Sequence, residues 1–106
     1  MSDYSKSQKV AVITRYDVQP DRQLDLASAL GRELGHWICK RPGYVSGTVR
    51  RSIDDLHVVV YTVWEREDDG INFLQSGEAK TLWDMLTASG ARIRDSHTYW
   101  LGETVE

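Results

Sequence analysis

Four tryptophans offer the clearest chemistry in this sequence of 106 residues: Trp37, Trp64, Trp83 and Trp100. A flat slot lined by indoles would hold a planar aromatic molecule away from water. A buried tryptophan also removes ~150–250 Å² of surface from water, so core packing alone can explain such residues. For Trp37, Trp64 and Trp83, which fall on apolar stretches of two expected helices and one expected strand, both interpretations stay open. For Trp100 and its neighbour Tyr99 we expect core packing.

Histidine and cysteine residues are too scattered for the usual metal-binding and catalytic motifs. His36, His57 and His97 form no HxxxH pair, and the single cysteine, Cys39, has no CxxC partner. The sequence also has no glycine-rich phosphate loop and no GxSxG motif. We therefore expect no metal site and no nucleophilic cysteine, and we expect His57 to be an ordinary residue at a strand end.

Two adjacent arginines, Arg50 and Arg51, end an expected strand. Because Asp54, Asp55 and Glu65 are near, we expect rim ion pairs, which contribute ~0–1 kcal/mol. A clamp for an anionic substrate is the alternative interpretation.

The bulk composition indicates one globular domain over residues 1–106, with residues 1–8 as a loose tail. The net charge of −3 and the pI of about 5.6 argue against nucleic acid as a partner, since such proteins concentrate positive charge. No signal-peptide core and no apolar run of ~20 residues is present, so we expect a cytoplasmic protein that does not cross a membrane.

The elements that would position the tryptophans follow from the apolar periodicity. Residue Pro20 suits the first turn of a helix, Pro42 and Gly43 suit its end, and Gly77 is expected to split a second helical region. We expect strands over residues 9–18, 44–53, 56–66 and 96–105, and helices over 20–41 and 67–89. This β-α-β-β-α-β order predicts an α+β, ferredoxin-like fold, with one antiparallel sheet and the helices on one face.

The third expected strand, HVVVYTVW (57–64), lacks the apolar–polar alternation of a half-exposed strand, which predicts burial on both faces. Two helices can cover only one face of a four-stranded sheet. We therefore expect a second copy of the chain to cover the face that carries Val59, Tyr61 and Val63, giving a homodimer. Residues Val60 and Thr62 would then point toward the helices of their own subunit, where a small-molecule cavity would lie.

The segment over residues 41–86 resembles the antibiotic biosynthesis monooxygenase (ABM) family of dimeric α/β barrels. The most telling pieces are the PGY motif at 42–44 and the VxYxxWE motif at 59–65, and the flanking VAVITRYDVQP and SHTYWL fit the outer strands of that family. Members similar to this chain oxidise anthrones to anthraquinones during aromatic polyketide biosynthesis. They use molecular oxygen as co-substrate and no metal or flavin.

The resemblance implies a dry aromatic cavity, donors to a developing phenolate and no cofactor. It also implies that Trp64 is the catalytic donor, through its indole N–H. Three further polar positions of the family are occupied here by Val60, Gly70 and Trp83. Two alternatives stay open: a polyketide cyclase or other non-oxidative tailoring enzyme, and a non-catalytic ligand-binding dimer. Haem-degrading relatives need a histidine about ten residues past the strand tryptophan, and residues 70–77 contain none.

The expected positions of side chains on the strands and helices also predict which residues bind the substrate. We expect the walls of the slot to be formed by Trp37, Val60, Thr62, Phe73 and Trp83. Thr14, Tyr16 and Thr48 would supply hydroxyls in place of the missing polar residues.

Overall fold

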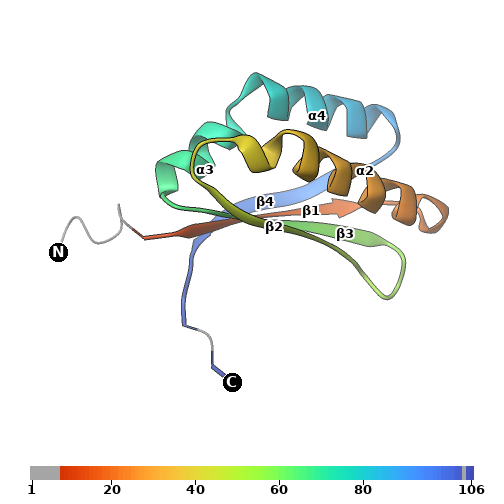
Figure 1. The fold of residues 1–106 in the computed structure, drawn as a ribbon. Helices are drawn as coiled ribbons and strands as arrows, with labels where there is room; N and C mark the ends of the chain where they lie inside the picture. Colours follow the sequence, from red (N-terminus) through yellow and green to blue (C-terminus); the bar gives the residue numbers. More distant parts are fainter. Residues whose placement is uncertain (1–7, 104) are drawn as a thin grey trace.

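A computed structural model describes residues 8–103, 105 and 106 of the chain. Strands and helices follow one another in the expected order (Figure 1). The elements are β1 (Val10–Asp17), α2 (Gln23–His36), β2 (Tyr44–Arg51), β3 (His57–Trp64), α3 (Glu67–Leu74), α4 (Gly77–Ala88) and β4 (Arg92–Trp100), with short 3-10 turns η1 (Pro20–Arg22) and η2 (Ile38–Lys40) on either side of α2. The expected tail over residues 1–8 lies, apart from Gln8, outside the described residues.

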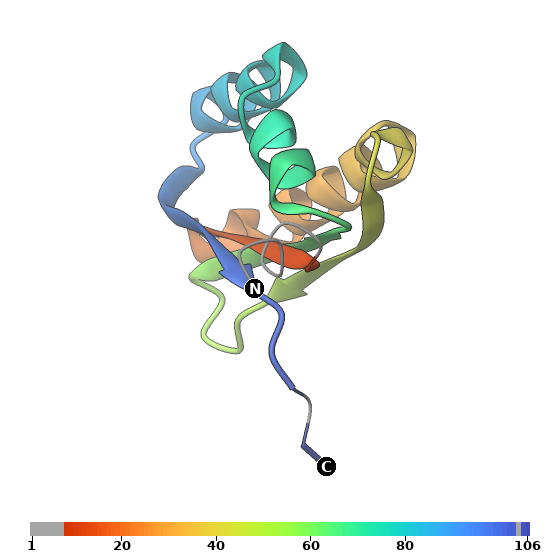
Figure 2. The same ribbon diagram turned by 90° about the vertical axis from the view of Figure 1, so that its left-hand side faces the viewer.

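The four strands form one antiparallel sheet in the order β2-β3-β1-β4, and all three α-helices lie on the same face (Figures 1 and 2). The expected α+β, ferredoxin-like fold is therefore confirmed. Because side chains alternate along a strand, Val58, Thr62 and Trp64 of β3 point toward the helices and are buried. The opposite face of the sheet, which we call the open face, has no helix over it among the described residues (Figure 2).

Most boundaries agree with the sequence pattern within a few residues. The second helical region does divide at Gly77, where the Ser76 hydroxyl accepts a hydrogen bond from the Ala79 N–H at 3.1 Å and caps α4. The last strand was placed wrongly: it begins at Arg92 rather than at residue 96. Charged residues fill its first half because β4 is an edge strand, where such side chains reach solvent and ion-pair partners.

Backbone conformation explains the glycine of the PGY motif. Residue Gly43 has a φ of 83°, and a Cβ at this position would collide with the Asp69 side chain. We expect Gly43→Ala to lower the free energy of unfolding by ~1–3 kcal/mol. Helical Gly31 has open space around it, so Gly31→Ala should raise stability by ~1 kcal/mol. Urea unfolding of both variants measures the two changes in free energy. Equal changes would contradict the special role of Gly43.

Candidate active site

A small enclosed cavity lies between the sheet and the helices and measures about 20 Å³. The structure brings six of the expected site residues together in its wall: Thr14 and Tyr16 from β1, Val60 and Thr62 from β3, Phe73 from α3 and Trp83 from α4. Aliphatic side chains of β1, α2, η2 and α4 complete the lining. Within the described residues no charged side chain lines this cavity, so its polar groups are the hydroxyls of Thr14, Tyr16 and Thr62 and the indole N–H of Trp83.

Residue Trp64 lies behind Thr62 rather than on the cavity wall. It is fully buried, and its indole N–H donates to the Thr62 hydroxyl at 2.9 Å. Its ring stacks on Phe73 with centroids 5.0 Å apart. In this structure the Thr62 hydroxyl takes up the indole N–H that was expected to face the substrate, because residues two apart on a strand share a face. In this arrangement Trp64 positions Thr62.

The hydroxyl of Tyr16 is the strongest neutral donor of the cavity. Its side chain is 2% exposed, and burial raises its pKa to about 12, with the nearby Trp83 side chain offsetting only part of the rise. The phenol therefore stays protonated at neutral pH. Thr14 is engaged elsewhere, because its hydroxyl lies 2.9 Å from that of Ser96.

Thr62 offers the second donor. Its hydroxyl accepts from Trp64 and reaches the Val12 carbonyl at 3.4 Å, the long end of the hydrogen-bond range. Its proton can therefore be redirected to an oxygen atom in the cavity at little cost.

Two expected site residues do not reach the cavity. A β-bulge between Tyr44 and Ser46 shifts the register of β2, so Thr48 pairs with Tyr61 and shares its place on the open face. Trp37 follows the end of α2 and lines a separate, wider groove between α2 and α4, of about 610 Å³. Its indole N–H donates to Glu33 at 2.7 Å.

Gly70 lies where helix α3 approaches the sheet. A Cβ at Gly70 would lie 3.3 Å from Val12 and 3.6 Å from Trp64. Helix α3 thus packs closely on the sheet here, and a side chain at residue 70 would require its neighbour Val12 to shift by a few tenths of an ångström.

Two aromatic side chains of β4 are partly exposed. Tyr99 is 48% exposed and Trp100 is 47% exposed, so the expectation that both pack in the core is wrong for the single chain. Both belong to the edge strand β4, and Tyr99 pairs with Ala11 on the open face.

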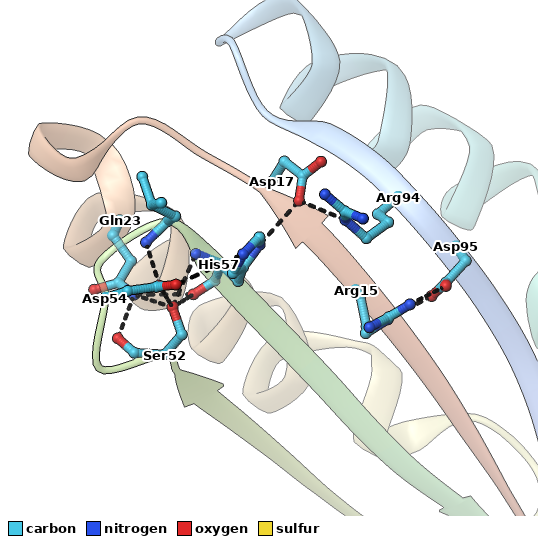
Figure 3. A network of polar contacts seen from close by, with 9 residues as sticks. Arg15, Asp17, Gln23, Ser52, Asp54, His57, Arg94 and Asp95 are labelled. Atoms are coloured by element: carbon cyan, nitrogen blue, oxygen red, sulfur yellow. Dashed lines mark hydrogen bonds and ion pairs between the residues drawn. The ribbon is translucent and has the colours of Figure 1, made fainter.

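One end of the open face carries a network of polar contacts (Figure 3). Asp95 accepts from Arg15 at 2.8 Å, and Asp17 accepts from Arg94 and lies 2.9 Å from His57 Nδ1. Hydrogen bonds lower the pKa of three carboxyl groups: that of Asp17 through Arg94, that of Asp95 through Arg15, and that of Asp54 through Ser52.

These contacts predict acid sensitivity. Because each folded pKa lies below the ordinary 3.8, the stability they contribute is present in full above that value and is lost as the pH falls through the lowered pKa. We expect the urea midpoint to drop as the pH falls below about 4, and Asp95→Asn to flatten part of that drop. An unchanged slope in Asp95→Asn would contradict a contribution from Asp95.

The expectation of ion pairs for Arg50 and Arg51 is wrong: neither pairs with a carboxylate within the described part of the chain. Asp54 and Asp55 lie beyond the end of the strand, in the turn between β2 and β3. Among residues 8–103, 105 and 106, no group of three or more His, Cys, Asp or Glu could hold a metal ion. Over the same residues no helix is long and apolar enough to span a bilayer.

Comparison with known proteins places the fold. A family model described as antibiotic biosynthesis monooxygenase matches residues 9–83. A proposed antibiotic biosynthesis monooxygenase from Deinococcus radiodurans superposes with a TM-score of 0.77 at 13% identity, covering 92% of this chain and 96% of that one. SnoaB, a cofactor-independent oxygenase from Streptomyces nogalater, superposes with a TM-score of 0.64 at 19% identity, covering 93% and 96%. No curated protein sequence matches the chain.

Proposed function

Because the chain belongs to the antibiotic biosynthesis monooxygenase family, we propose that it is a cofactor-independent monooxygenase acting on a polycyclic aromatic, polyketide-type substrate of the anthrone class. The observation that carries this proposal is the enclosed cavity, in which aromatic and aliphatic walls surround uncharged hydroxyl donors. Such a site suits a planar, apolar substrate whose oxygen becomes negatively charged during reaction.

The proposed chemistry needs donors rather than a metal. Transfer of a proton from the anthrone methylene to a water molecule makes a carbanion, whose charge lies largely on the phenolate oxygen. A neutral phenol such as Tyr16 stabilises that charge without a counterion, and Thr62 offers a second donor. The carbanion then reduces oxygen. The methylene loses two hydrogens and becomes a carbonyl with one oxygen atom, and the other oxygen atom leaves as water with those hydrogens.

The cavity must open before a tricyclic substrate enters. Its volume of about 20 Å³ is close to that of one water site, whereas ligand pockets usually span ~300–1,000 Å³. Helix α4 is the wall that we propose to move, because only Ala79, Leu82 and Leu86 of this helix are buried. Of these, Leu82 lines both the cavity and the groove between α2 and α4, so it separates the two spaces.

Removal of the Trp83 indole should reduce the free energy that is needed to open the cavity. We expect Trp83→Ala to bind a non-reactive anthraquinone ~5–10-fold more tightly, because the binding-competent state becomes more populated. Quenching of tryptophan fluorescence measures the affinity. Met85→Ala, which removes an exposed side chain of α4 from the groove, should bind as the wild type does. Equal affinity of Trp83→Ala and wild type would contradict this role of Trp83.

We also propose that the chain forms a homodimer through the open face. Its apolar half consists of Ala11, Ile13, Tyr61, Val63 and Tyr99, which occupy neighbouring positions on three strands. Ala11 and Val63 are already buried in the single chain, so a partner would mainly cover the side chains of Ile13, Tyr61 and Tyr99. Sedimentation should give twice the monomer mass of 12.1 kDa, and a monomer at micromolar concentration would contradict the proposal.

Oxygen uptake tests the proposed activity. Purified protein, with a chelator and without added flavin, is mixed with an anthrone while oxygen and quinone absorbance are recorded. We expect one oxygen consumed per quinone, well above the slow oxidation seen without protein. A folded protein that consumes no oxygen would contradict the proposal. Conversion without oxygen would indicate a cyclase or other non-oxidative tailoring enzyme, and binding without conversion would indicate a ligand-binding dimer.

A further inference from the structure

The groove between α2 and α4 lies on the helix side of the sheet, away from the open face through which we propose the dimer to form (Figure 2). Its volume of about 610 Å³ falls within the ~300–1,000 Å³ that ligand pockets usually span. Its lining includes Glu33 and Trp37 near the end of α2, and Glu78 and Leu82 of α4. The groove therefore has the size of a ligand site, and the proposed dimer would leave it accessible.

The groove shares a wall with the enclosed cavity. Leu82 lines both spaces, and its side chain is buried. On the cavity side the polar groups are uncharged, whereas on the groove side they include the carboxylates of Glu33 and Glu78. A substrate whose ring system occupies the opened cavity could thus extend a substituent past Leu82 into surroundings of a different polarity.

Residue Glu33 gives the groove an uncompensated negative charge. Among the described residues no basic side chain lines the groove, and Glu33 has no ion-pair partner. The second carboxylate, that of Glu78, lies 3.5 Å from Arg41, which offsets its charge. A concave surface with one free carboxylate attracts a single positive charge.

The Glu33 carboxylate is already oriented. Its Oε1 atom accepts the Trp37 indole N–H at 2.7 Å, and both side chains are half-buried. A carboxylate has about four acceptor sites, and Oε2 receives no hydrogen bond from the described part of the chain. One oxygen atom is thus held in place and free for a ligand, which lowers the ordering cost of binding. The neighbouring indole ring also favours a cation, since cations bind over aromatic faces.

From this geometry we infer that the groove receives a positively charged substituent of the substrate, such as a protonated amine, and that Glu33 selects it. The inference rests on the proposed function, because it places the ring system of the same substrate in the cavity. An ammonium group forms a charge-assisted hydrogen bond with the free Glu33 oxygen, whereas a hydroxyl forms only a weaker bond and a carboxylate is repelled. Residue Glu33 is thus a specificity-determining residue that lies outside the cavity.

Binding of non-reactive anthraquinones tests this role of Glu33. Each compound carries an arm of one, two or three methylene groups that ends in either an amine or a hydroxyl. We expect the amine to bind the wild type ~5–10-fold more tightly than the matched alcohol at the arm length that reaches Glu33. Quenching of tryptophan fluorescence measures both affinities.

The variant Glu33→Gln keeps an oxygen acceptor for the Trp37 N–H and removes the charge. In this variant the amine and the alcohol should bind within about twofold of each other, while the alcohol binds as it does to the wild type. The unchanged alcohol affinity shows that the variant is folded. The control Glu67→Gln makes the same charge change at an exposed residue of α3 outside both spaces, and it should keep the preference for the amine.

Several results would overturn the inference. Equal binding of amine and alcohol to the wild type at every arm length would do so, as would a preference that survives in Glu33→Gln. An equal loss of preference in Glu67→Gln would indicate a general charge effect. Absence of binding by all the compounds would overturn the inference together with the proposed substrate class. A preference for the amine in a protein that consumes no oxygen would support the role of Glu33 and contradict the oxygenation alone.

Discussion

We expect Tyr16→Phe to lower kcat for quinone formation by ~10²-fold, the effect of removing one donor to a developing oxyanion. The phenol lines the cavity, is 2% exposed and keeps its proton at neutral pH because burial raises its pKa to about 12. Since the benzene ring remains, the packing around residue 16 is kept. Loss of the hydroxyl should cost only ~1 kcal/mol of stability.

The matched control is Tyr61→Phe, which removes the same hydroxyl from the opposite face of the same sheet. Tyr61 pairs with Ile13 and is excluded from the cavity by strand alternation. Its substitution should leave kcat within about twofold of wild type, since it removes no donor from the cavity. Full activity of a folded Tyr16→Phe protein would show that the Tyr16 hydroxyl does not act in the reaction.

The second large effect concerns stability. We expect Trp64→Ala to lower the free energy of unfolding by ~3–5 kcal/mol, because it leaves a cavity in the core. Trp64 is fully buried and stacked on Phe73, with Tyr44 packed against its edge. That loss would be a large share of the ~5–15 kcal/mol that holds a typical domain folded. Urea unfolding measures it, and a loss under ~1 kcal/mol would contradict the burial.

The hydrogen bond from Trp64 to Thr62 can be separated from this packing effect. Thr62→Val keeps the shape but leaves the indole N–H without a partner, which should cost ~1–3 kcal/mol. The double variant Trp64→Phe/Thr62→Val removes both partners and should be more stable than the sum of the single losses predicts. Strict additivity would show that the two side chains do not interact.

Much of the fold was predictable because the apolar periodicity is clear in this sequence. Because successive side chains of a strand point to opposite faces, Val60 and Thr62 were predicted to lie on the helix side, and both line the cavity. The same rule failed at Thr48, because a bulge adds one residue to β2 and reverses the alternation beyond it. Nothing in the sequence around Tyr44 and Ser46 indicates that bulge.

Other errors came from ends of elements and from contacts between side chains. Helix α2 ends at His36, so its helical periodicity does not extend to Trp37, which lines the groove between α2 and α4. The first half of β4 was not predicted as a strand, because it is rich in charged residues, which are rare in strands. In the structure Arg94 and Asp95 form ion pairs with β1. The partner of the Trp64 N–H could have been found, since Thr62 lies two residues earlier on the same strand.

The most direct test of the account is the fate of the oxygen atoms. The protein is allowed to turn over an anthrone under heavy-isotope dioxygen, and the quinone is analysed by mass spectrometry, with the uncatalysed oxidation subtracted. The account predicts one labelled oxygen atom in each quinone formed, with the second labelled atom in water. A product that contains no label, formed at the enzymatic rate, would contradict oxygenation by this protein.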